Sequence, residues 1–127
     1  MSRTRIAGIS PYEATVGFSR AVRAGTHIFV AGTAPIWADG SCDPSPLAQA
    51  RRCWEIALEA LGKAGGSARH VVRTRQFITR ADVQDDVGRA HGEVFADIRP
   101  ASTMVVVAGL LDPRWVVEVE LDAIVDD

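Results

Sequence analysis

The sequence predicts an α+β fold in which two helices pack on one face of a mixed β-sheet. Three observations lead to this prediction. Two stretches repeat apolar residues every three or four positions, which is typical of amphipathic helices. About six other stretches alternate or cluster β-branched and aromatic residues, as strands do. Glycine and proline separate these stretches, so the predicted order is strand, hairpin, helix, strand, helix, strand, strand.

The length and composition describe an ordinary globular chain. With 127 residues, we expect residues 1–127 to form a single domain. No apolar run is long enough to cross a bilayer and no secretory signal follows the first Met, so a cytoplasmic protein is expected. Cys42 and Cys53 predict neither a disulfide nor a metal site. The net charge of −2 comes from intermixed charges, which argues against a nucleic-acid or anionic-membrane binder.

The first third of the chain predicts three strands and a loop. Strands are expected over residues 3–9, 17–23 and 27–31, and a turn at 24–26 joins the last two as a hairpin. In the second strand Phe18, Arg20 and Val22 share one face. Gly32 follows the hairpin. It is either a glycine that the turn at the strand end requires or one that lets a ligand approach the backbone closely. Residues 34–46 are predicted to be a loop, of a length that is often functional.

Two helices are expected. The first begins at Pro46 with Ser45 as its cap, runs to about Ala64 and is ended by Gly65-Gly66. Its apolar stripe consists of Leu47, Ala50, Trp54, Ala57, Leu58 and Leu61. The second runs from Val83 to about Asp97 with Asp82 as its cap, and its apolar side holds Val87, Ala90, His91, Val94 and Phe95. A structural role for His91 is favoured over a catalytic one.

The remaining strands are expected over residues 70–79, 104–108 and 116–125. In the first of these, Val71, Arg73, Arg75 and Phe77 are assigned to one face and Val72, Thr74, Gln76 and Ile78 to the other. In the last, Val117, Val119, Leu121 and Ala123 share a face opposite Glu118, Glu120, Asp122 and Ile124. The carboxylates either form a solvated face or include one that lines a pocket, and the arginines either pair with them or face an anionic ligand.

One face of this sheet is left without helices. Large exposed apolar patches are rare on monomers, so we expect copies of the chain to cover that face in a closed, rotationally symmetric oligomer.

Several motifs, in order along nearly the whole chain, resemble those of the reactive intermediate deaminase family. This family is also called YjgF or RidA and is often labelled endoribonuclease L-PSP. The matching segments are residues 17–25, 28–33, 49–52, 71–75, 90–95, 99–105 and 117–123. The resemblance implies a chorismate-mutase-like α+β fold and a homotrimer with three clefts between neighbouring subunits. It also implies hydrolysis of small imines and enamines, such as 2-aminoacrylate, to keto acids and ammonia without metal or cofactor.

The resemblance assigns roles to particular residues. Glu120 matches the glutamate that positions the attacking water, and a carboxylate in a partly desolvated cleft suits acid–base work. Phe18 and Trp115 are candidate pocket walls, and Gly32 and Thr33 are candidate ligand contacts. Ser102 stands where the deaminases have the arginine that grips the substrate carboxylate, as in the arginine-lacking subgroups of the family.

Other departures also bear on the substrate. Losing the charge-assisted contact at Ser102 costs on the order of 2 to 4 kcal/mol of binding free energy. Val106 and Gly109 replace the Glu and Arg that relatives often have, which makes the cleft less polar. Arg75 or Arg99 is a candidate for taking over the anion contact.

Three functions follow as candidates. The first is a cofactor-free deaminase or hydrolase of a small imine or enamine. The second is a specialised pathway enzyme on the same trimer that catalyses a tautomerisation, cyclisation or hydrolysis. The third is a metabolite-binding trimer without catalysis. A ribonuclease is the least favoured, because the chain has neither a basic stripe nor paired histidines for phosphoryl transfer.

Overall fold

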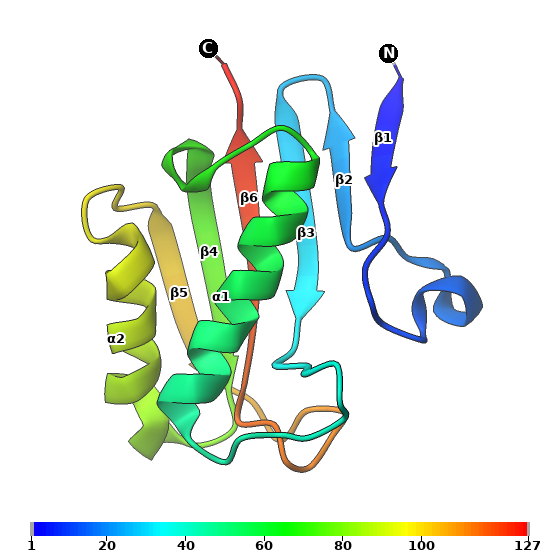
Figure 1. Ribbon diagram of the computed structural model, residues 1–127. Helices are drawn as coiled ribbons and strands as arrows, with labels where there is room; N and C mark the ends of the chain where they lie inside the picture. The colour runs from blue at the N-terminus through cyan, green and yellow to red at the C-terminus, as the bar shows by residue number, and fades with distance from the viewer. Residues whose placement is uncertain (1, 127) are drawn as a thin grey trace.

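The computed structural model describes residues 2–126 and has one six-stranded sheet with two helices on one face (Figure 1). The elements are β1 (Arg3–Ile6), the π-helical turn η1 (Glu13–Gly17), β2 (Ala21–Ala24), β3 (His27–Thr33), α1 (Pro46–Lys63), the short 3₁₀ turn η2 (Ala68–His70), β4 (Val71–Ile78), the 3₁₀ turn η3 (Ala81–Val83), α2 (Gln84–Phe95), β5 (Ala101–Val106) and β6 (Val117–Ile124). The predicted α+β class is confirmed, and the order of elements is confirmed as well.

The strand order in the sheet is β1-β2-β3-β6-β4-β5. Four of the pairings are antiparallel and only β4 with β5 is parallel. The last strand, β6, therefore lies in the middle of the sheet between β3 and β4 (Figure 1). Because both neighbours of β6 hold it by backbone hydrogen bonds, its side chains stand in fixed positions on the two faces.

The core lies between the helices and one face of this sheet. On β6 the residues Val117, Val119 and Leu121 are fully buried, and the residues between them are half-buried, so the predicted alternation is confirmed. From the helices, Trp54 and Phe95 meet edge to face with ring centroids 5.0 Å apart, and both are 1% exposed. Such an aromatic pair contributes beyond its buried area, so it anchors α1 to α2.

The ends of α1 follow the predicted capping chemistry. The Ser45 hydroxyl accepts a hydrogen bond from the Ala48 N–H at 3.2 Å, and Pro46 occupies the first turn. At the other end Gly65 has φ of +93°, and the Gly66 N–H donates to the Leu61 carbonyl at 2.9 Å. These bonds form a Schellman motif, which requires a residue that tolerates the left-handed region.

Two predicted strands are shorter than expected. β1 ends at Ile6 rather than residue 9, and β2 begins at Ala21 rather than residue 17. The reason is the loop between them, in which the Glu13 carboxylate accepts from the Gly8 N–H at 3.0 Å and so closes the segment before η1. Gly17, with φ of +88°, then turns the chain toward β2.

Three further expectations were wrong in detail. A register shift between Val71 and Arg73 buries Val71 and leaves Val72 44% exposed, which reverses their predicted faces, because a bulge adds a residue to one strand. Asp82 does not cap α2; its carboxylate pairs with Arg80 Nε at 2.7 Å and the helix begins at Gln84. β5 spans 101–106 rather than 104–108, since parallel pairing with β4 starts at Ala101.

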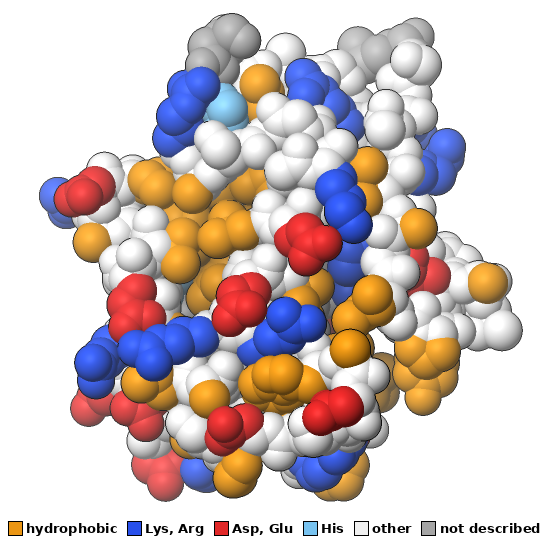
Figure 2. Space-filling view, viewed as in Figure 1, with side chains coloured by type: hydrophobic (Ala, Val, Ile, Leu, Met, Phe, Trp, Pro, Cys, Tyr) orange, Lys and Arg blue, Asp and Glu red, His pale blue; other side chains and the backbone are white. Residues whose placement is uncertain are grey.

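The helix-covered face carries charges of both signs without a stripe of one sign (Figure 2). In the same view hydrophobic side chains stand out at the lower right, over the segment that contains η1, where Ile9, Tyr12 and Val16 are more than half exposed. Within residues 2–126, the helices are too short or too polar to cross a membrane.

Candidate functional site

The uncovered face of the sheet holds a cavity of about 660 Å³. Its floor is a row of side chains that cross four paired strands, Arg5, Val22, Phe29 and Asp122. Glu120 lines the cavity one step along β6, and Phe18 forms part of its wall. Of the β6 carboxylates, Glu120 and Asp122 both line this cavity and both keep about one third of their side-chain surface exposed to solvent.

Glu120 is held by an ion pair across the sheet. Arg75 lies opposite Glu120 in the β4–β6 register, and its Nη1 is 3.2 Å from Glu120 Oε1 and 3.4 Å from Asp122 Oδ2. All three side chains are about one third exposed, so water reaches them. The guanidinium of Arg75 thus bridges two carboxylates, whose oxygens accept hydrogen bonds.

A second, larger cavity of about 940 Å³ lies beyond Phe18 and Ala31, which line both cavities. Glu118 and Gly32 belong to this second cavity, and so does Trp115, one of the predicted pocket walls. Burial raises the pKa of the Glu118 carboxyl above its usual value, with Arg20 opposing the shift. The two glutamates of β6 therefore lie in different surroundings although they are only two residues apart.

The Glu118 carboxylate occupies the space that Gly32 leaves open. A Cβ atom on Gly32 would lie 2.6 Å from Glu118 Oε2, so any larger residue there displaces the carboxylate. On the other side of the same glycine, Arg20 Nη2 donates to the Gly32 carbonyl oxygen. Gly32 thus leaves room for the Glu118 carboxylate. Its φ is not positive, so no turn conformation that favours glycine accounts for the residue.

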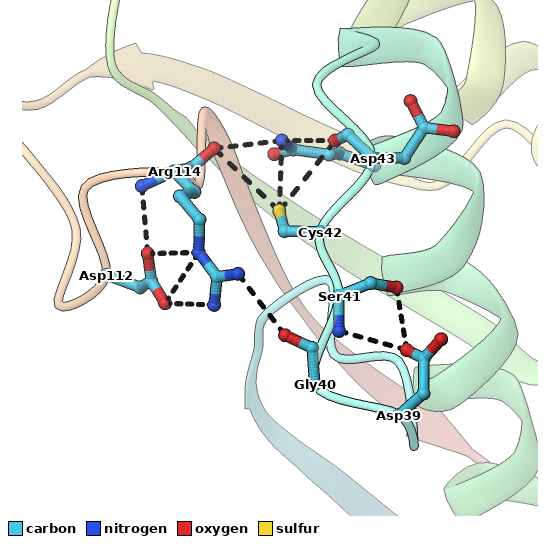
Figure 3. Close-up of polar contacts among 8 residues, drawn as sticks. Asp39, Gly40, Ser41, Cys42, Asp43, Asp112 and Arg114 are labelled. Atoms are coloured by element: carbon cyan, nitrogen blue, oxygen red, sulfur yellow. Dashed lines mark hydrogen bonds and ion pairs between the residues drawn. The ribbon is translucent and has the colours of Figure 1, made fainter.

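Two loops form the outer rim of the second cavity and are tied together (Figure 3). Arg114 pairs with Asp112 at 2.8 Å and donates to the Gly40 carbonyl at 3.2 Å. Beneath them the buried amide of Gln49 donates to the carbonyls of Asp43 at 2.8 Å and Arg114 at 2.9 Å. Because one buried side chain bonds both loops, the rim is fixed by the core of the protein.

Four predicted site residues line neither cavity, and one of them, Arg75, contacts the lining carboxylates of Glu120 and Asp122. Thr33 is fully buried and its hydroxyl donates to the Ala31 carbonyl at 2.8 Å. Arg99 is exposed just after α2 with φ of 57°. Ser102 pairs with Thr74 in the β4–β5 register, on the opposite face from Glu120.

The Ser102 hydroxyl belongs to a polar network beside α2. It accepts from the Thr74 hydroxyl at 2.8 Å and from Gln76 Nε2 at 3.2 Å. His91 Nε2 lies 2.8 Å from Thr74 Oγ1, and the His91 ring packs on Trp54. Burial lowers the pKa of His91. Within one chain, Ser102 and Glu120 are therefore not brought together.

Sequence reasoning missed several cavity residues. Glu118 had a usable signal, since it alternates onto the same face as Glu120. Arg20 and Trp37 had none, because their positions depend on the loops after β1 and β3. No cluster of three His, Cys, Asp or Glu side chains suited to a metal ion occurs within residues 2–126.

Comparisons with known proteins agree with this architecture. A protein of Mycobacterium tuberculosis, Rv2704, described as a member of the YjgF/YER057c/UK114 family, has a crystal structure that superposes with a TM-score of 0.89 at 40% identity, covering 98% of this chain and 100% of that chain. The uncharacterized Streptomyces coelicolor protein SCO2049 is 39% identical over 122 residues, 94% of this chain and 90% of that protein. Escherichia coli TdcF, solved with bound serine, shares the fold at 22% identity and a TM-score of 0.80, with 94% and 92% of the two chains covered.

The family described as Endoribonuclease L-PSP matches residues 8–125, which include every element from η1 to β6 and all residues of both cavities except Arg5. The resemblance stated from the sequence motifs is confirmed by this match together with the relatives above. The chain belongs to the Endoribonuclease L-PSP family, also known as the YjgF/RidA family.

Proposed function

We propose that the protein is a cofactor-free hydrolase of a small imine or enamine metabolite, with Glu120 as its acid–base residue. The observation that supports this most directly is the water-accessible Glu120 carboxylate beside a cavity on the uncovered sheet face, held by Arg75 at 3.2 Å. Membership in the YjgF/RidA family supports a role with small metabolites. The serine bound in the structure of TdcF, which shares the fold, is consistent with a ligand of this size.

The reaction requires one group that accepts a proton from water as the water adds to the substrate and donates that proton afterwards. Glu120 accepts a proton from water while the water oxygen bonds to the imine carbon, and it returns that proton to the nitrogen. Glu120 then takes the hydroxyl proton of the carbinolamine and passes it to the nitrogen, so that the C–N bond breaks with loss of ammonia as the C=O bond forms. An ionised carboxylate beside a cation is suited to the first step, and a positioned acid–base group contributes typically 10²–10⁴-fold in rate.

Arg75 is our candidate for the residue that binds the negatively charged group of the substrate. Its guanidinium already contacts two carboxylates on this face, so a substrate carboxylate beside Glu120 lies within its reach. Arg99 is exposed in the segment between α2 and β5. Arg75→Gln is expected to weaken substrate binding more than Arg99→Gln does, and unchanged affinity with both residues replaced would refute an anion contact by either arginine.

We also propose that the active form is a homotrimer whose subunits cover the open face. Phe29 and Val105 are exposed there by 46% and 41%, which is unusual for large apolar side chains that face water. Closed symmetry lets each subunit close the cavity of its neighbour. Native mass spectrometry and light scattering test this, and a monomer at micromolar concentration would contradict it.

The decisive assay couples a pyridoxal-phosphate enzyme that releases 2-aminoacrylate to detection of the keto acid. Wild type is expected to accelerate keto-acid formation, and Glu120→Gln to reduce the rate to that of solvent hydrolysis. Asp122→Asn is the matched control, because it removes a carboxylate from the same strand face and the same arginine. Equal losses in both variants would assign the effect to the ion pair rather than to Glu120.

The competing function is metabolite binding without catalysis, or a specialised reaction on a different metabolite. It is favoured by the position of Ser102, whose hydroxyl is engaged on the helix face and supplies no substitute for the family's arginine in this chain's own cavity. In that case the assay shows no acceleration, and a bound metabolite raises the melting temperature in wild type and in Glu120→Gln alike.

A further inference from the structure

The cavity beside Glu120 carries opposite charges at its two ends. Arg5 on the edge strand β1 lines one end, and Glu120 and Asp122 on the central strand β6 line the other. Between them the row of paired residues places the apolar side chains of Val22 and Phe29. A cation, an apolar floor and carboxylates in that order are complementary to a ligand that is itself charged at both ends.

Arg5 supplies a cation that is not already engaged. It is exposed, and among residues 2–126 its guanidinium forms no hydrogen bond or ion pair. By contrast, Arg75 is shared between two carboxylates, and Arg20 donates to the Gly32 carbonyl. The planar guanidinium fork matches the geometry of a carboxylate. Of these three arginines, Arg5 is therefore the one most available to an anionic group of a ligand.

The opposite end of the cavity keeps an excess of negative charge. Glu120 and Asp122 share the single guanidinium of Arg75, so at neutral pH one negative charge is left unbalanced there. Glu13 also lines the cavity, but its carboxylate already accepts from the Gly8 N–H at 3.0 Å. Because opposite charges attract, a protonated nitrogen is favoured at the β6 end.

The spacing of the strands sets the length of the ligand. The strands β1, β2, β3 and β6 are neighbours, and three steps of about 4.8 Å put the backbones at Arg5 and Asp122 about 14 Å apart. Side chains stand roughly perpendicular to a sheet, so the charged groups at the two ends remain on the order of 10 Å apart. The adjacent charges of an α-amino or α-imino acid are too close together to contact both ends.

We propose that this cavity binds a zwitterionic metabolite with a protonated amine or imine at one end, an apolar spacer of several carbon atoms, and a carboxylate at the other end that Arg5 binds. This ligand class rests on the proposed function, which places the reacting nitrogen beside Glu120. Arg75 remains the contact for a negative group next to that nitrogen, and Arg5 selects for a distant one. Val22 and Phe29 contact the spacer.

Four probes test the two charges and the distance between them. They are 6-aminohexanoate; 6-aminohexanamide, which lacks the anion; 6-hydroxyhexanoate, which lacks the cation; and 3-aminopropanoate, which carries both charges on a shorter chain. Backbone amide chemical shifts of the intact protein follow each titration and are expected to change at Val22, Phe29 and Asp122. 6-Aminohexanoate is expected to bind roughly fivefold or more tightly than each of the others, because each of them loses one charged contact.

Two variants assign the carboxylate contact. Arg5→Gln is expected to bind 6-aminohexanoate and 6-aminohexanamide equally. Arg3→Gln is the matched control, because it removes the same charge from the same face of β1 without lining the cavity, and it is expected to keep the wild-type preference. Equal behaviour of the two variants would overturn the role of Arg5.

The wild-type measurements decide the proposal independently of turnover. It is overturned if wild type binds none of the probes, or if it binds 6-aminohexanoate no more tightly than any one of the other three. Keto-acid formation tests the proposed function separately. A wild type that prefers 6-aminohexanoate without accelerating hydrolysis would refute the hydrolase and support the binding proposal, and hydrolysis with equal binding of the probes would do the reverse.

Discussion

Replacing Gln49 by alanine should loosen the rim of the larger cavity and destabilise the whole fold. Gln49 is fully buried on α1, and its amide makes three main-chain hydrogen bonds. Its Nε2 donates to the carbonyls of Asp43 and Arg114, and its Oε1 accepts from the Val116 N–H at 2.8 Å. One side chain thus replaces the backbone pairing that two loops cannot provide for themselves.

The size of the effect depends on whether each main-chain partner of Gln49 can form a hydrogen bond with water in the alanine variant. The Val116 N–H is in a residue only 9% exposed, and a buried donor left without a partner costs about 1–3 kcal/mol. Asp43 and Arg114 are exposed, so their carbonyls turn to water and the loss is about 0.5–1.5 kcal/mol for each bond. The expected decrease in the free energy of unfolding is therefore about 2–6 kcal/mol, centred near 4 kcal/mol.

Urea unfolding followed by circular dichroism measures this decrease. Arg51→Ala is the control on the same helix, because its side chain is exposed and pairs with Glu93 at the surface, where ion pairs contribute little. A decrease below about 1 kcal/mol for Gln49→Ala would refute the reasoning, since it would mean that the loops and the Val116 N–H find other partners.

Three further predictions concern single positions. Ser45→Ala removes the cap of α1 and should lower the free energy of unfolding by about 1 kcal/mol, measured by urea unfolding. Gly65→Ala should lower it by about 1–2 kcal/mol, because φ is +93° and the new Cβ meets Arg23 Nη1; a neutral result would mean that the turn relaxes. Burial lowers the pKa of His91, so its contribution to stability is complete above pH 6.5 and declines as the pH falls below it. Wild type should therefore lose more thermal stability than His91→Gln between pH 7.5 and 5.5, and equal losses would contradict this.

Local patterns in the sequence were sufficient for the elements and for most faces. The alternation in β6 predicted its buried and open sides correctly because backbone pairing on both edges enforces the period of two. The end of α1 was predictable for a similar reason, since Gly65-Gly66 meets a specific backbone requirement. These features depend on neighbours in sequence or on a regular ladder.

The errors arose where a single residue interrupts such regularity. Val72 is the extra residue of the bulge in β4, so it lies on the face opposite to the predicted one. No residue type predicts where a bulge occurs. The closed loop at Glu13 shortened β2 and placed Arg20 in a cavity rather than on a regular strand. Ser102 was predicted from the resemblance to stand where the deaminases have an arginine, whereas the face it takes is set by its parallel register with Thr74. The register between strands that are distant in sequence cannot be predicted from a local sequence pattern.

Glu118 and Glu120 give a final test of whether the structure distinguishes two carboxylates that the sequence presents as equals. Burial raises the pKa of Glu118, so the folded state holds its proton more tightly than the unfolded chain does. The stability that comes with this proton is present below about pH 4.5 and is lost as the pH rises through the folded-state pKa. Glu118→Gln should therefore gain stability relative to wild type as the pH rises from 4 to 7. Thermal unfolding at both pH values measures this gain, with Glu59→Gln, an exposed carboxylate on α1, as the control for removing one charge. A difference that is constant with pH, or that shrinks toward neutral pH, would show that the Glu118 carboxylate is as well solvated as one at the surface.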